Sequence, residues 1–246
     1  MPEKTKNREL PKISEDNDKF EFTRESITVV DEKGKKHTLY RIRAKKDMTL
    51  HRITLEDYPR WYRIMYGIGD LLDDLSKPLD PDGWLRMPED RSRRIRIYTI
   101  RVRKGDLGGF IEKEENLDYK SEAWVFPGGM VYEGGKVSGY AMIRGKNVRV
   151  SGNAQVYGFA YLSGYVVVRD NAEVCDDAEV SGYAGYVVIS DDAKVCVDAK
   201  VSGQGVIGGK SRVIGEIKLH KVVITDGTWT YGDITEKNGA KEAKRP

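Results

Sequence analysis

The chain has 246 residues, 33% of them charged and 39% hydrophobic, and a net charge of +3 at pH 7. It is long enough to bury a core, and so small a net charge does not by itself indicate nucleic acid or a membrane as a partner. No apolar run approaches the ~20 residues that a membrane helix needs, and the polar N-terminus does not resemble a signal peptide. We therefore expect a cytoplasmic protein with no membrane partner.

Residues 19–120 are predicted to form an α+β region that caps the repeats following it. The polar segment 1–18 precedes this region and is expected to be a disordered tail. Strand patterns occur at 19–23 and 38–44. An insertion of about 47–103 then separates these strands from the sequence KGDLGG that leads into the repeats.

Part of the insertion has the pattern of a helix. Thr54 is a suitable N-cap, and apolar residues recur at helical spacing from Trp61 to Leu75. Prolines end this pattern, so 77–90 is expected to be an acidic loop. The helix could cover the open end of a solenoid or contact a partner. We favour the first role, because an uncovered first coil exposes strand edges and apolar core.

A basic run begins at Arg91 and ends at Lys104, with seven basic residues and no acidic one. Its isoleucines alternate with arginines, which predicts a strand with one phase change or bulge. The arginines could contact nucleic-acid phosphates or an acidic protein surface. Alternatively, they form the solvated face of the strand and pair with acidic residues nearby.

The insertion concentrates aromatic residues and arginines, the residue types that protein interfaces favour. We therefore expect partner binding here and not on the repeats. A host protein is the expected partner, with nucleic acid as an alternative along the basic run. The candidate partner-binding residues are Trp61, Tyr62, Tyr66, Trp84, Arg91, Arg93, Arg94 and Arg96.

Between residues 121 and 219 aliphatic residues recur every six positions, usually with a small residue two positions earlier. Each hexad is interpreted as one short strand and one turn, and three hexads close a coil of about 18 residues. The sequence therefore predicts a mainly β fold, a single-stranded β-solenoid of about five coils. The aliphatic positions are Val125, Val131, Val137, Ile143, Val150, Val156, Leu162, Val168, Val174, Val180, Ile189, Val195, Val201, Ile207, Val213 and Leu219.

The end of the chain contains a hairpin signal. Asp226 and Gly227 stand between two β patterns, so 220–235 is predicted to be a C-terminal hairpin cap. The last residues, 236–246, are expected to be a disordered tail.

Two cysteines, Cys175 and Cys196, each follow an inward valine of the repeat. They should stack on adjacent coils with Cα atoms about 5 Å apart. Two cysteines cannot supply a disulfide framework or a zinc site, and free thiols are expected in the cytoplasm.

The hexads resemble those of hexapeptide-repeat, left-handed β-helix proteins. Residues 104–117, KGDLGGFIEKEENL, resemble the lead-in GDLGGWIEKEENL of uncharacterised β-solenoid proteins that are often borne by phages or prophages. Phe110 stands where those proteins usually have Trp, and the insertion interrupts what is otherwise a short connection into this lead-in. The resemblance implies a left-handed solenoid and a phage-encoded accessory protein in the cytoplasm of a bacterial host.

Hexapeptide-repeat proteins are best known as acyltransferases, which need a histidine base at a coil. His37, His51 and His220 all lie outside the hexads, and their scatter does not indicate a zinc site. No catalytic residue, metal site or cofactor is therefore predicted.

An acidic belt between residues 165 and 200 could engage a basic partner, but most of its members stand at turn positions that favour Asp without any catalytic role. A solvated face is the preferred interpretation. The belt consists of Asp170, Glu173, Asp176, Asp177, Glu179, Asp191, Asp192 and Asp198.

These features favour a non-enzymatic scaffold that engages a host macromolecule and could inhibit a bacterial defence system. Two alternatives stay open. One is an acyltransferase-like enzyme. The other is a structural component of a virion or polymer, which would form homo-oligomers.

Overall fold

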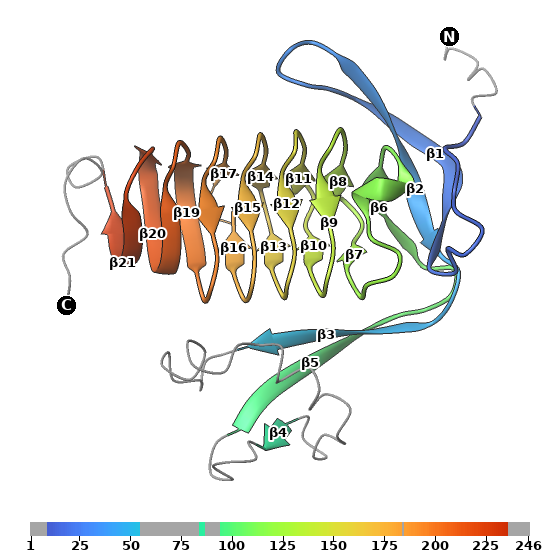
Figure 1. Ribbon diagram of the computed structural model, residues 1–246, viewed down its shortest axis with the longest axis horizontal. Coiled ribbons are helices and arrows are strands. Elements are labelled where there is room, and N and C mark those ends of the chain that lie inside the picture. The colour runs from blue at the N-terminus through green and yellow to red at the C-terminus, as the bar shows by residue number, and fades with distance from the viewer. Residues whose placement is uncertain (1–8, 55–83, 87–93, 184, 236–246) are drawn as a thin grey trace.

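The six-residue period of the sequence forms one short strand and one corner per hexad, and three hexads close one turn of a β-solenoid (Figure 1). The computed structural model describes residues 9–54, 84–86, 94–183 and 185–235, without the side chains of 53, 54, 84–86 and 94–97. These residues are mainly β and contain a solenoid of about seven turns of about 18 residues. The predicted fold class is therefore confirmed in its main part.

The strands stack into three parallel ladders, here called faces A, B and C. Face A contains β7 (Trp124–Val125), β10 (Met142–Arg144), β13 (Tyr161–Ser163) and β16 (Glu179–Ser181). Face B contains β8 (Met130–Val131), β11 (Arg149–Val150), β14 (Val166–Val168) and β17 (Val187–Ile189). Face C contains β9 (Lys136–Val137), β12 (Gln155–Val156), β15 (Glu173–Val174) and β18 (Lys194–Val195). The last turns use the longer strands β19 (Lys200–Ile207), β20 (Arg212–Ile224) and β21 (Thr228–Ile234), which pass from one face to the next.

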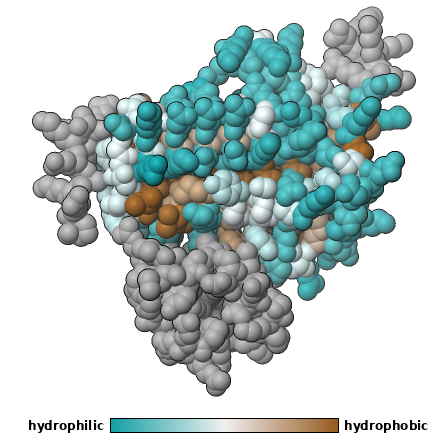
Figure 2. All heavy atoms as spheres, viewed as in Figure 1, coloured by the Kyte–Doolittle hydropathy of each residue, from teal (hydrophilic) through white to brown (hydrophobic). Residues whose placement is uncertain are grey.

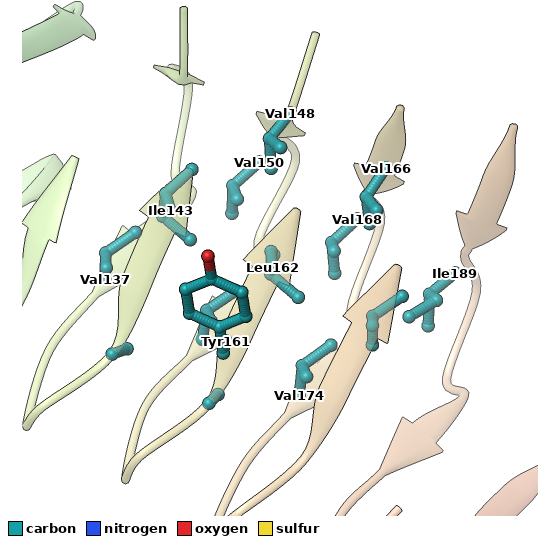
Figure 3. Close-up of a cluster of buried hydrophobic side chains, with 14 of the residues drawn as sticks. Val137, Ile143, Val148, Val150, Tyr161, Leu162, Val166, Val168, Val174 and Ile189 are labelled. Atoms are coloured by element: carbon teal, nitrogen blue, oxygen red, sulfur yellow. The ribbon is translucent and has the colours of Figure 1, made fainter. Parts of the chain in front are cut away.

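The aliphatic residues of successive turns lie directly above one another, as the hexads predicted. On face A, Ile143 pairs with Val125 below it and with Leu162 above it. The side chains of Ile143 and Leu162 point into the interior (Figure 3), and all three residues are fully buried. The small residues two positions earlier, such as Ala141, are equally buried. At Gly129, which holds the same position in its hexad, an added Cβ would lie 2.9 Å from Ile143 Cγ2, so the interior there leaves little room for larger side chains.

The solenoid is longer than predicted and begins before residue 121. The strand β6 (Leu107–Ile111) runs parallel to β8 on face B, and Leu117 bridges Val137 on face C. These residues form a first turn in which Ile111 and Leu117 keep the six-residue spacing, but Val125 lies eight residues after Leu117. Hexad counting from Val125 to Leu219 missed this turn and the last one, which contains β21, and gave about five coils in place of about seven.

The predicted C-terminal hairpin is wrong. The strand β21 runs parallel to β20, with Trp229 beside Val213, so the Asp226–Gly227 turn is another corner of the solenoid. Hairpin turns and solenoid corners both use residues that tolerate a left-handed backbone, and Gly227 has φ of 88°. A local turn signal therefore could not separate the two.

In its described residues the N-terminal region is β and contains no α-helix, where an α+β region was predicted. The strands β1 (Phe20–Val30) and β2 (Lys36–Ala44) form an antiparallel hairpin, and β2 pairs antiparallel with β6. The sheet of face B thus continues into strands that cover the first turn (Figure 1). The predicted helix and acidic loop fall within 55–83 and 87–93, outside the described residues.

Part of the segment expected to be a disordered tail packs on the first turn. The carboxylate of Glu114, in the short helix η1 (Glu114–Asn116), accepts hydrogen bonds from Ser14 and from the buried Asn17. Residues 1–8 and 236–246 lie outside the described part of the chain.

Lys19 closes the same end of the solenoid from within. Its side chain is only 1% exposed, and its ammonium donates to the backbone carbonyls of Asp118, Ser121 and Ala123 at 2.9, 2.8 and 2.5 Å. Burial lowers the pKa of Lys19 to about 8, against the ordinary value of 10.5.

The glycine pair of the KGDLGG sequence allows β6 to approach its neighbours closely. A Cβ on Gly108 would lie 2.6 Å from Ile42 Cγ1, and one on Gly109 would lie 2.4 Å from the carbonyl oxygen of Gly129. A side chain at Gly108 would therefore push β6 away from the capping hairpin, and one at Gly109 would push it away from the next turn of the solenoid.

Cys175 and Cys196 stack on neighbouring turns of face C, as predicted, with Cα atoms 4.6 Å apart. The expectation of free thiols is wrong, because the two residues form a disulfide. Residues at equivalent positions of adjacent turns have Cα atoms about 4.8 Å apart, which lies within the range of Cα separations that disulfides require.

Candidate partner-binding site

The insertion leaves and rejoins the fold at a single point. The Ala44 N–H donates to the Asp106 carbonyl at 2.9 Å, and the Gly105 N–H donates to the Ala44 carbonyl at 2.8 Å. The pairing of β2 with β6 thus closes without the insertion, which is an excursion from an otherwise continuous cap.

The described part of the insertion is a separate sheet, here called the arm. It consists of β3 (Met48–Thr54), β5 (Arg94–Val102) and β4 (Trp84–Arg86), with β5 in the centre and antiparallel to both neighbours. The strand predicted in the basic run is therefore present. The predicted bulge is absent from its pairing with β3, which keeps one register from end to end.

The arm runs alongside the coils and is attached to face A (Figure 1). The Arg52 guanidinium lies 3.7 Å from the centre of the Tyr161 ring and forms an ion pair with Glu179 at 3.0 Å. His51 Nδ1 lies 2.8 Å from Glu122 Oε2. At its base Leu50 and Val102 are buried and join the main core. The arm is thus held by both apolar packing and specific polar contacts.

The predicted site residues are only partly located. Arg96 lies between Thr54 and Trp84 in the three-stranded sheet, and Arg94 pairs with Arg86. The structure thus brings Trp84 and Arg96 to directly paired backbone positions. The remaining candidates lie outside the described residues: Trp61, Tyr62, Tyr66, Arg91 and Arg93.

The acidic belt serves the corners of the solenoid. Asp170, Asp176 and Asp191 all have φ between 56° and 58°, and each carboxylate accepts a backbone N–H from the next turn at 2.7–3.3 Å. Glu173 pairs with Lys194 at 2.8 Å. The coil surface seen in Figure 2 is largely hydrophilic, with a narrow hydrophobic band along the coils. The fold itself therefore explains these carboxylates.

A groove of about 410 Å³ separates the turn of the β1–β2 hairpin from the corners of face B. The hairpin packs on this face through Leu39, which is buried with Met130 and Tyr132. Across the groove, Arg169 forms an ion pair with Glu32 of the hairpin turn. The groove is thus lined by charged groups of both signs.

Beside this groove lies a histidine surrounded by carboxylates, two of which, Asp31 and Glu133, line the groove. His37 is 1% exposed, and its Nδ1 lies 2.9 Å from Glu112 Oε1. Its Nε2 lies 3.2 Å from Asp31 Oδ2 and 3.4 Å from Glu133 Oε1. Burial alone would lower the pKa of His37, but hydrogen bonds to Glu112 and Asp31 and the charge of Glu133 outweigh it and raise that pKa.

Sequence reasoning missed this cluster. His37 was placed outside the hexads, and Glu112 and Glu133 are 75 and 96 residues away along the chain. Only the stacking of the hairpin on face B brings them together. His220, the third histidine, lies 3.6 Å from Asp233 at the other end of the solenoid.

Comparison with known proteins assigns no family to this chain, since no family model, curated protein or solved structure matches it. In the part of the chain that the structure describes, no helix is long and apolar enough to cross a lipid bilayer.

Proposed function

We propose that this protein is a non-enzymatic binding scaffold, in which the solenoid presents the insertion of residues 47–103 to a macromolecular partner. One observation carries the proposal: β2 pairs with β6, and backbone hydrogen bonds join Ala44 to Gly105 and Asp106 just before β6, so the capping sheet closes without the insertion. A long segment that the cap does not need, rich in aromatic residues and arginines, has the composition of an interface.

The way the arm is attached supports this role. Arg52, Tyr161 and Glu179 fix β3 against a stack of strands whose core is fully buried. A binding segment held on a rigid support loses less conformational entropy when it binds. The corner hydrogen bonds of the acidic belt also support a structural role for those carboxylates over a catalytic one.

The nature of the partner follows from composition and resemblance. Basic residues from Arg91 to Lys104 favour an acidic protein surface or nucleic-acid phosphates. The similarity of residues 104–117 to the lead-in of phage-borne, left-handed β-solenoid proteins supports a phage-encoded accessory protein. Its partner is then a macromolecule in the cytoplasm of the bacterial host, and a defence component is the first candidate.

A deletion variant tests the proposal. Residues 47–103 are replaced by a Gly-Ser-Gly linker between Lys46 and Lys104. The solenoid should stay folded by circular dichroism, with a modest loss of melting temperature because Leu50 and Val102 no longer pack on it. The tagged wild-type chain should capture a partner from bacterial lysate that the deletion variant does not, and the purified partner should reproduce the difference.

Two substitutions refine this test. The quadruple change of Arg91, Arg93, Arg94 and Arg96 to Ser should weaken binding and leave the melting temperature nearly unchanged. If the partner is nucleic acid, wild-type binding should also fall steeply with salt. On the acidic belt, Asp192→Asn should leave binding unchanged. A folded deletion variant that binds as well as wild type would show that the site lies elsewhere.

A further inference from the structure

We propose that Asp31, His37 and Glu133 bind a divalent transition-metal ion of the zinc class, at the junction between the β1–β2 hairpin and the solenoid. The three residues come from the hairpin turn, from β2 and from the corner after β8. The proposal is independent of the partner-binding function assigned to the insertion.

Two of the three separations between the ligand atoms match those around a metal ion. His37 Nε2 is 3.2 Å from Asp31 Oδ2 and 3.4 Å from Glu133 Oε1, and all three atoms lie within 4.8 Å of one another. Zinc binds nitrogen and oxygen at about 2.0–2.2 Å, which places tetrahedral ligands roughly 3.3–3.5 Å apart. An ion therefore needs little movement of these side chains.

Glu112 orients the histidine for this role. Its Oε1 lies 2.9 Å from His37 Nδ1, so it accepts the Nδ1–H and leaves the Nε2 lone pair facing the other two carboxylates. Metal-binding histidines usually donate their second N–H to a carboxylate in this way. A neutral His37 would otherwise direct a lone pair at two acceptors, a repulsion that only a proton or a metal ion relieves.

Each carboxylate is held by the backbone through its other oxygen. Asp31 Oδ1 accepts the N–H groups of Lys33 and Lys35 at 2.9 and 2.8 Å. Glu133 Oε2 accepts the Gly152 N–H at 2.7 Å. The free oxygens of both residues therefore remain directed at the histidine. A site preorganised in this way binds an ion without first ordering its ligands.

Charge also favours a divalent cation. Three carboxylates, from Asp31, Glu112 and Glu133, contact one histidine that is 1% exposed, so even a protonated imidazole leaves an excess of negative charge. Nearby Arg169 is paired with Glu32. The mixed donor set of one imidazole and two carboxylates suits zinc, manganese, iron or cobalt better than magnesium or calcium.

The groove provides access to the site. Asp31 and Glu133 line the cavity of about 410 Å³, so an ion can enter and water from the groove can complete its coordination. Because the ligands join the hairpin to a coil corner, the bound ion should fasten the hairpin to face B.

Zinc titration of the full chain, without an affinity tag and after treatment with EDTA, tests the proposal. Isothermal titration calorimetry at pH 7 without reductant should show one zinc per chain, and zinc should raise the melting temperature. The Asp31→Asn and Glu133→Gln variants keep the backbone hydrogen bonds but should lose tight binding. Glu112→Gln should weaken zinc binding by about 10–100-fold.

The matched control is Asp191→Asn. Like Glu133, Asp191 has a positive φ, and its carboxylate accepts a backbone N–H from the next turn at 2.7 Å. This variant should bind zinc like wild type, as should the double change Cys175→Ser and Cys196→Ser. Absence of zinc binding to wild type would overturn the proposal and leave His37 as a protonated histidine. Binding that survives in both Asp31→Asn and Glu133→Gln, or that depends on the cysteines, would overturn it equally.

Discussion

Cys175 and Cys196 are joined by a disulfide across two neighbouring turns of face C, 21 residues apart along the chain and with Cα atoms 4.6 Å apart. Their neighbours Val174 and Val195 pair in the ladder, so the bridge reinforces contacts that the backbone already makes. The disulfide spans a turn of 21 residues, longer than the 18-residue period of the solenoid, with the extra residues just before Val187.

Removing the disulfide should destabilise the protein measurably. Closing a loop of this length removes conformational entropy from the unfolded chain, which raises the free energy of unfolding by about 3 kcal/mol. The double change of Cys175 and Cys196 to Ser should therefore lower the free energy of unfolding by ~2–4 kcal/mol. Urea unfolding with and without dithiothreitol measures the loss, and reduced wild type should match the variant. Two free thiols in unreduced, denatured wild type would contradict the bridge.

The interior of the solenoid should reject charge. Val174 is fully buried, so Val174→Asp places a carboxylate among aliphatic side chains and should cost about 4 kcal/mol or more. Its neighbour Glu173 points outward and pairs with Lys194 at the surface. Glu173→Gln should cost no more than about 1 kcal/mol. Thermal melts that rank the two variants in the opposite order would show that the inward and outward positions are reversed.

The period of the core could be predicted from the sequence because each hexad carries its own signal. Val150 and Val168, for example, pair across one turn although an irregularity precedes the first of them. Residue spacing alone determines which side chains share the interior. The same reasoning predicted the stacking of Cys175 on Cys196, but it could not predict their oxidation state, which depends on the environment as well as on distance.

The parts that could not be predicted depend on contacts between distant segments. The strand β21 has the turn chemistry of a hairpin, and only its pairing with β20 shows that it continues the coils. In the first turn, Ile111 and Leu117 are six residues apart, but Val125 lies eight residues after Leu117, so the turn stands outside the regular run of hexads. Its place at the start of the solenoid follows from the pairing of β2 with β6 and of β6 with β8. The His37 cluster likewise forms only when the hairpin lies on face B.

Lys19 should make stability depend on alkaline pH. Its folded pKa of about 8 lies below the ordinary 10.5, so the unfolded chain binds more protons between these values. The free energy of unfolding should therefore rise between pH 8 and pH 10.5, by about 3 kcal/mol from this residue. As pH falls to 8 and below, this contribution should be lost. Urea unfolding at pH 7, 8.5 and 9.5 should show the gain for wild type relative to Lys19→Met. Parallel pH profiles of the two proteins would exclude Lys19 as the source.

Arg52 should control how firmly the arm is attached. Its guanidinium stacks 3.7 Å from the centre of the Tyr161 ring and also pairs with Glu179, a combination of about 1–2 kcal/mol that acts between the arm and the coils. Arg52→Ala should therefore speed amide hydrogen exchange in β3 several-fold, while the coils keep their protection. Arg52→Lys keeps the charge but not the planar stacking, so its effect should be intermediate. If exchange in β3 is unchanged in Arg52→Ala, then Leu50, Val102 and the His51–Glu122 contact hold the arm, and Arg52 contributes nothing to its attachment.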